Sequence, residues 1–300
     1  ISVVNVEDNS IGSDIKSPYV VPPGIKRDID NTTIIQRRTN EQSLQLCFND
    51  LSDGDARAVF KESNFDLINY GRIRMFIHAE ANNSEILTDN EVHAFLRFGS
   101  DYEYNYYEIE LPLKITRPSL LNQNNINIER LVWPEENEIN LDIQELLSLK
   151  SERNRLNIDV TTPFSKSSNN GNYTLKIVGR PSMSTVLNFM LGVRNPLSID
   201  RGDKSACVWF NELRLTDFDK TKGWAANANL NLKLSDFATV SSSARYTSVG
   251  FGSIQQRISE RAREERLQYD ASANINLDKF LPSKSGIKLP LYVAISKSKI

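Results

Sequence analysis

The clearest pattern in the sequence is a strict alternation of apolar and polar residues in GWAANANLNLKL, residues 223–234. Successive side chains of a strand point to opposite faces, so this alternation predicts a strand with one apolar and one polar face. The apolar face could contact a protein core, a partner or lipid. Its positions are Trp224, Ala226, Ala228, Leu230, Leu232 and Leu234, and the polar positions between them include Asn227, Asn229, Asn231 and Lys233.

Three later segments continue this alternation, namely 238–246, 269–277 and 287–295. Strands of soluble proteins average about 5–6 residues, whereas a tilted strand that crosses a bilayer needs about 9–11. The length therefore favours strands of a membrane barrel. Antiparallel sheets of soluble proteins also alternate, so an ordinary soluble sheet remains the alternative on periodicity alone.

Aromatic residues recur at one end of these segments. If the first three strands are antiparallel neighbours, then Trp224, Tyr246 and Tyr269 share one rim, where amphipathic rings would anchor a barrel at the membrane surface. The same rim carries the long connection 248–267, while residues 235–237 join the first two strands at the other rim. Because outer-membrane barrels have long outer loops and short inner turns, we expect the Trp224 rim at the cell surface, provided that Asp236 lies in a turn rather than a bulge.

The preceding part of the chain predicts a different kind of β-structure. Residues 1–40 are rich in Asp, Pro and Asn and are expected to form an extended lead-in, possibly associated with the barrel. Many short alternating segments separated by turn-rich links predict an antiparallel sandwich over 41–218. Residues 142–153 have helical spacing instead, and Asp142 and Glu145 are spaced like a capping box. The predicted strands are 43–48, 72–79, 92–98, 106–113, 173–179, 186–193 and 207–215.

Composition narrows the function classes. The 300 residues carry a net charge of −2, which gives no reason to expect a nucleic-acid surface or a polybasic anchor. No run of about 18 apolar residues occurs, so no transmembrane helix is expected. The chain opens ISVVNVEDNS without an initiator Met, and we expect it to be an internal fragment.

The sequence offers little catalytic or metal-binding chemistry. His78, Glu80 and His93 could approach one another, but no third-ligand motif supports a metal site. No phosphate-binding loop or nucleophile elbow occurs. We therefore expect no catalytic residues, no metal and no cofactor, and we do not expect an enzyme. The mixed-charge run 256–268 is expected to form a solvated helix in the long connection.

Cys47 and Cys207 leave two alternatives open. They could pair across a sheet in an oxidising compartment, or they could be two buried thiols. The sequence alone does not decide between these states.

Several motifs, in their order and spacing, resemble the SprA (Sov) family of outer-membrane translocons. They include PYVVPPGIKRD, WFNELRL, GWAA, LSDFATVS, GFGSI and KFLPSKSGIKLPLY, and they spread over nearly the whole chain. This family belongs to the type IX secretion system of Bacteroidota and also supports gliding motility. The resemblance implies a very large single-chain barrel that exports folded cargo with C-terminal sorting domains. It also implies a PorV-type shuttle and a plug protein as partners, and an excerpt from the middle of such a translocon.

The combined prediction is an all-β chain. A jelly-roll-like antiparallel sandwich with one helix is followed, over 219–300, by antiparallel strands of a large transmembrane β-barrel. The sandwich is expected on the extracellular side of the outer membrane. Ala226, Ala228, Leu230, Leu232 and Leu234 are then predicted to face lipid, and Asn227, Asn229, Asn231, Lys233 and Arg245 to line the lumen.

Two other hypotheses compete with the translocon. The first is a soluble surface lectin or adhesin, in which Tyr102, Tyr104 and Tyr106 stack on sugar rings. In this case the segment CVWFNELRL resembles the closing strand of carbohydrate-binding jelly rolls. The second is a structural β-protein with no partner of its own.

Overall fold

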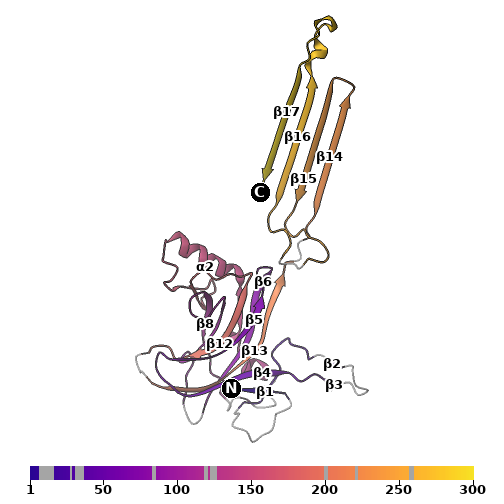
Figure 1. Ribbon diagram of the computed structural model, residues 1–300. Coiled ribbons are helices and arrows are strands. Elements are labelled where there is room, and N and C mark those ends of the chain that lie inside the picture. Colours follow the sequence, from indigo (N-terminus) through magenta and orange to yellow (C-terminus); the bar gives the residue numbers. More distant parts are fainter. Residues whose placement is uncertain are drawn as a thin grey trace. The chain divides into compact units, whose positions relative to one another are not determined.

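The computed structural model describes residues 1–6, 17–27, 29–30, 37–82, 86–117, 121, 127–198, 202–219, 222–256 and 260–300. The chain divides into two compact units, Ile1–Phe218 and Asp219–Ile300. Figure 1 gives the strand and helix labels. Among the helices of the described ranges, none has the length and apolar character needed to cross a membrane.

The first unit contains two large antiparallel sheets (Figure 1). One has the order β1 (Ser2–Asn5), β4 (Gln42–Leu51), β13 (Lys204–Phe218), β6 (Tyr70–Ala81) and β9 (Ile139–Asp142). The other has the order β10 (Phe164–Ser167), β11 (Thr174–Val178), β8 (Tyr106–Pro112), β7 (His93–Gly99), β12 (Val186–Arg194) and β5 (Ala56–Phe65). A separate two-stranded ribbon pairs β2 (Ile29–Asp30) with β3 (Arg37–Arg38).

These two sheets share one hydrophobic core. Alternate side chains of each strand point inward, so buried residues of both sheets belong to one contiguous cluster. The first sheet contributes Ile77 and Val208, and the second contributes Leu96, Ile109 and Ile177. The predicted all-β, antiparallel architecture with a helix is therefore confirmed.

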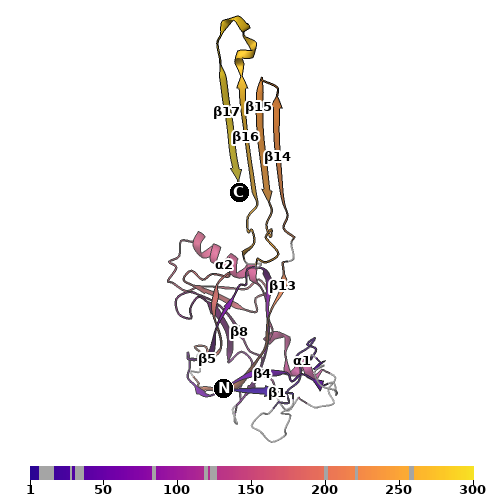
Figure 2. The ribbon, with the colours of Figure 1, turned by 45° about the vertical axis from the view of Figure 1, so that its right-hand side comes forward.

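The predicted helix is α2 (Ile143–Arg155), which packs against β6, β9, β10 and β11 (Figure 2). Asp142 caps it, because its carboxylate accepts a hydrogen bond of 2.8 Å from the backbone N–H of Gln144. Glu145 does not complete a capping box, since it accepts from the backbone N–H of Asn169 instead. A second short helix, α1 (Ile128–Val132), was not predicted from the sequence.

Part of the expected lead-in packs on the outer face of the first sheet. β1 pairs with β4, and Tyr19 is 4% exposed. The Tyr19 ring lies 6.2 Å from that of Trp133 and 5.9 Å from that of Trp209, measured between centroids. These residues therefore belong to a second hydrophobic cluster. Residues 7–16, 28 and 31–36 of the lead-in lie outside the described residues.

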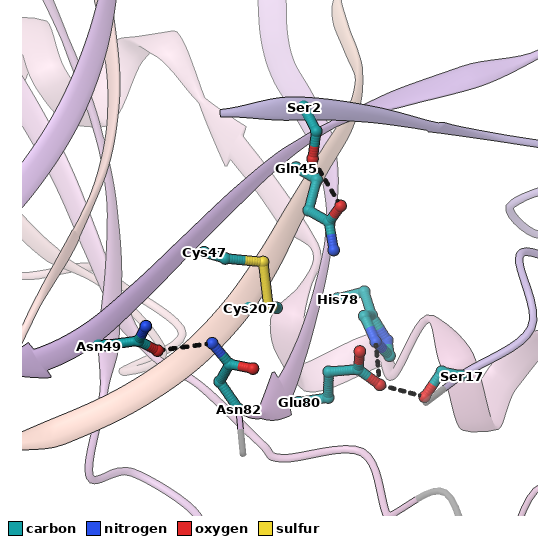
Figure 3. Close-up of a disulfide and its surroundings, with 9 residues drawn as sticks. All are labelled: Ser2, Ser17, Gln45, Cys47, Asn49, His78, Glu80, Asn82 and Cys207. Carbon is teal, nitrogen blue, oxygen red and sulfur yellow. Dashed lines mark hydrogen bonds and ion pairs between the residues drawn. A yellow bond between two sulfur atoms is a disulfide. The ribbon is translucent and has the colours of Figure 1, made fainter. Parts of the chain in front are cut away.

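The two cysteines form a disulfide on this sandwich (Figure 3). Cys47 in β4 and Cys207 in β13 are directly opposed in the antiparallel register, which brings their Cα atoms to 4.0 Å. Their bond settles the alternative that the sequence left open. Disulfides persist in oxidising compartments and are rare in the cytosol of most cells.

We expect this disulfide to be present in the protein as the cell makes it. If cells are lysed in denaturant with a thiol-alkylating reagent, Cys47 and Cys207 should remain unlabelled, because a disulfide sulfur is not a nucleophile. Reduction before alkylation should label both. Peptide mass spectrometry reads out the result, and full labelling without reductant would contradict it.

The second unit is a four-stranded antiparallel sheet (Figure 2). Its strands are β14 (Ala225–Leu234), β15 (Ala238–Thr247), β16 (Arg266–Asn276) and β17 (Pro290–Lys299), paired in chain order. β14 and β17 are the edges, so the sheet is not closed. Asp236 lies in a tight turn, in which the Phe237 N–H donates to the carbonyl of Leu234, and the pairing of β14 with β15 continues without a register shift.

The prediction of a helix over 256–268 is wrong. Residues 261–265 are irregular, and β16 begins at Arg266, where it pairs with Thr247. The mixed charges fit a solvated strand end as well as a helix, so charge spacing did not distinguish them. Residues 257–259 lie outside the described residues.

Candidate membrane-facing sheet

The register of β14–β17 sorts the side chains into two faces. Directly opposed residues of neighbouring strands point to the same face, and faces alternate along each strand. The four strands therefore share one set of cross-strand rows, which we call the apolar face. From one rim to the other, its rows are Ala226–Tyr246–Leu267–Lys299, Ala228–Ala244–Tyr269–Lys297, Leu230–Ser242–Ala271–Ile295, Leu232–Val240–Ala273–Val293 and Leu234–Ala238–Ile275–Leu291.

The apolar face has no covering layer within the described part of its unit. Leu230 is 53% exposed, Val293 52% and Ile295 57%. Soluble monomers rarely leave a contiguous patch of this kind in water, so its exposure indicates a further contact. The hydroxyl of Ser242, the polar member of the central row, donates to the backbone carbonyl of Asp270 at 3.2 Å. This bond removes much of the cost of placing that hydroxyl in an apolar environment.

The opposite face is polar and carries a shallow hollow. The structure places the predicted lumen residues on this face, since Asn227 is opposed to Arg245 and Asn231 to Ser241. A shallow hollow of about 580 Å³ lies over it. The residues around this hollow include Asn229, Asn231, Ser241, Ser243, Asp270, Tyr292 and Ser296. A solvent-open hollow lined by polar side chains fits contact with water on this face.

The predicted aromatic residues cluster at one rim. The rings of Trp224 and Tyr246 lie 4.5 Å apart between centroids. Tyr269 lies on the same face, one row deeper, opposite Ala244. At the other rim, Phe237 and Phe280 form an edge-to-face pair at 5.3 Å, which the sequence analysis missed. The sequence could have predicted this pair, because Phe237 directly precedes the predicted strand 238–246 and Phe280 follows the predicted strand 269–277.

The spacing of these aromatic pairs can be compared with the apolar band of outer-membrane barrels. Phe237 lies nine positions before Tyr246 in the chain, which corresponds to about 30 Å of strand at ~3.4 Å per residue. With a tilt of about 40°, this length spans about 23 Å, against an apolar band of about 25 Å in outer-membrane barrels.

The Trp224 rim is fixed by close backbone packing. The N–H of Trp224 donates to the Ser248 hydroxyl at 2.8 Å, and the N–H of Ser248 donates to the Trp224 carbonyl at 2.9 Å. A Cβ on Gly223 would lie 1.9 Å from the backbone nitrogen of Phe251, so only glycine fits there. This contact brings the motifs GWAA and GFGSI, which are separate in the sequence, together at one rim of the sheet.

The histidines considered for metal binding lie in different sheets. His78 in β6 is fully buried, and its Nδ1 donates to the carbonyl of Val132 at 2.8 Å. Its Nε2 is 3.7 Å from Glu80, which accepts a hydrogen bond of 2.5 Å from Ser17 (Figure 3). His93 in β7 contacts Glu110 at 2.8 Å. Within the described ranges, no group of three or more His, Cys, Asp or Glu residues is placed to hold a metal ion.

The tyrosines of the lectin hypothesis do not form a common platform. Tyr106 is 7% exposed, with the guanidinium of Arg97 4.0 Å from its ring centroid. Tyr102 packs on Phe60 at 5.0 Å, and Tyr104 is 70% exposed. Of the three rings, Tyr106 is therefore withdrawn from stacking on a sugar.

The fold and the two-faced sheet define an all-β protein whose second unit exposes a large apolar surface among its described residues. A family model described as motility related/secretion protein, SprA_N, matches residues 1–300, so the chain belongs to that family. The resemblance stated from the motifs is thereby confirmed. A search among curated proteins finds no match.

Proposed function

We propose that β14–β17 form part of the wall of an outer-membrane barrel. The apolar face contacts lipid, and the polar face lines a water-filled lumen. The open edges at β14 and β17 pair with further strands, because unpaired backbone groups in hydrocarbon each cost several kcal/mol. In this arrangement Trp224, Tyr246 and Tyr269 anchor one membrane surface and Phe237 and Phe280 the other.

One observation carries this proposal, namely the cross-strand segregation of apolar and polar rows between two aromatic rims. A soluble sheet with this face would need a covering layer. A barrel wall needs none, because lipid covers it. The match between the spacing of the rims and the apolar thickness of an outer membrane adds a constraint that a soluble sheet has no reason to meet.

The membership in a motility and secretion family supports a protein-conducting role for this barrel. We propose that it exports folded cargo proteins with C-terminal sorting domains and that it works by shape rather than by chemistry, so it is not an enzyme. Its proposed partners are the cargo, a PorV-type shuttle, a plug protein and the bilayer, and its host is one of the Bacteroidota.

The proposed orientation places the Trp224 rim and the sandwich at the cell surface. The sandwich precedes this rim directly in the chain, and the long connection between β15 and β16 leaves from the same rim. The disulfide in the sandwich fits an oxidising, extracytoplasmic environment.

Carbonate extraction and surface proteolysis of the intact protein in its native cells test the proposal. We expect it to stay in carbonate-washed membranes and to be cut by external protease within 250–256 or 260–265. Retention without cleavage would keep the barrel and contradict the orientation. Release into the soluble fraction would contradict the barrel itself.

A further inference from the structure

Two lysines interrupt the apolar face, and both lie at the rim of Trp224 and Tyr246. Lys299 is opposite Leu267, and Lys297 is opposite Tyr269. Both side chains are exposed, and within the described residues neither forms an ion pair. Further along β17, the same face carries only Ile295, Val293 and Leu291. The positive charges are therefore confined to the two rows nearest one rim.

A charge on a lipid-facing surface is costly unless it reaches the polar headgroup layer. Lysine reaches this layer by extending its alkyl chain along apolar surface and placing its ammonium group in the polar layer. Aromatic rings mark the depth of the interface, and Tyr269 stands directly beside Lys297.

We propose that Lys297 and Lys299, together with Tyr269, bind the phosphate of a membrane-lipid headgroup. This inference rests on the proposed lipid-facing role of the sheet. Two neighbouring ammonium groups complement a negatively charged phosphate. A free phosphate ion would find only two solvated lysines here. A lipid phosphate is in addition held at this depth by its acyl chains, which lie on the Ile295 and Val293 rows of the same face.

The test compares the intact protein, purified from membranes in neutral detergent, with two charge-matched double variants. K297Q/K299Q removes the proposed site. K233Q/K288Q removes two other exposed lysines, one on the polar face and one just before β17. Native mass spectrometry measures binding of phosphatidylglycerol, with diacylglycerol of the same chains as the phosphate-free lipid and inorganic phosphate as competitor.

We expect wild type and K233Q/K288Q to retain phosphatidylglycerol and not diacylglycerol. K297Q/K299Q should bind phosphatidylglycerol about thirtyfold more weakly, from the summed contribution of two lysines near a charged membrane surface. Unchanged binding in K297Q/K299Q would overturn the inference, as would displacement of the lipid by an equal concentration of inorganic phosphate.

Carbonate extraction of the same proteins separates this inference from the proposed function. If wild type stays in the membrane while K297Q/K299Q binds lipid normally, only the headgroup site is wrong. If carbonate releases the wild-type protein, the proposed lipid-facing role of the sheet is wrong, and the headgroup site that depends on it is wrong as well.

Discussion

Leu230→Arg is expected to prevent most of the protein from assembling in the outer membrane, whereas Asn231→Arg is expected to assemble normally. Leu230 belongs to the central row of the apolar face, together with Ser242, Ala271 and Ile295. An arginine at the bilayer midplane on the lipid side of a barrel costs about 2–4 kcal/mol. Asn231 is the next residue in β14 but points to the polar face, where an arginine stays in water.

The depth of the substitution gives a second, graded expectation. The cost should fall from Leu230→Arg through Leu232→Arg to Leu234→Arg, because arginine costs only about 0–1 kcal/mol near the interface. The measurement is the carbonate-resistant fraction of each variant at matched expression. Equal assembly of Leu230→Arg and Asn231→Arg would show that this face does not contact lipid. A covering protein layer would instead make all three leucine variants similarly costly, without a gradient.

The strands and faces of the second unit could be predicted from the sequence because one turn fixes the register of its first two strands. Strict alternation assigns the faces of β14, and the turn at Asp236 sets β15 against it without a shift. The fourth strand was displaced in the prediction. It starts at Pro290, whose missing N–H suits the first position of a strand, and it ends at Lys299. Lys297 and Lys299 occupy positions of the apolar face. Because they are polar, the alternation of apolar residues stops at Ile295, and the prediction ended the strand too early.

The strands and contacts of the sandwich were harder to predict where the local sequence pattern and the long-range strand pairing disagree. β5 was missed, because Arg57, Lys61 and Glu62 interrupt its alternation. β5 is an edge strand, and charged side chains are common on edges because they discourage aggregation. The packing of Tyr19 against Trp133 and Trp209 joins three segments that are distant in the sequence. A local sequence pattern cannot predict such a contact.

The same sandwich contains a buried charge cluster that only the paired strands reveal. Glu108 in β8 is fully buried and lies between Lys176 in β11 and Arg97 in β7, which are its direct cross-strand neighbours. Its carboxylate is 2.7 Å from the Lys176 ammonium and 2.6 Å from the Arg97 guanidinium. Arg194 in β12 adds a third contact at 3.3 Å. The carboxylate is thus the shared partner of three cations.

Burial alone raises the pKa of the Glu108 carboxyl, but the charges of Lys176, Arg97 and Arg194 outweigh it and hold this pKa below its usual range. A carboxyl whose pKa is lower in the folded state stabilises the fold at pH values above its unfolded pKa, which is about 4.3 for glutamate. This contribution is lost as the pH falls through the lower, folded pKa. The sandwich should therefore be fully stabilised by Glu108 near neutral pH and should lose this stabilisation only in acid.

Glu108→Gln should lower the free energy of unfolding of the sandwich by about 2–3 kcal/mol at pH 7, because it removes the charge that the partly buried Lys176 and Arg97 share. Glu152→Gln is the matched control, since the Glu152–Lys166 pair lies at the solvent-accessible surface, where such pairs add little to stability. Hydrogen exchange of backbone amides in β7, β8 and β11 of the intact protein measures both variants. As the pH falls below the unfolded pKa of about 4.3 and through the lower, folded pKa, the difference between wild type and Glu108→Gln should shrink, because the unfolded wild-type chain binds a proton that the folded carboxylate resists. Equal protection of both variants at pH 7 would show that the three cations do not depend on Glu108.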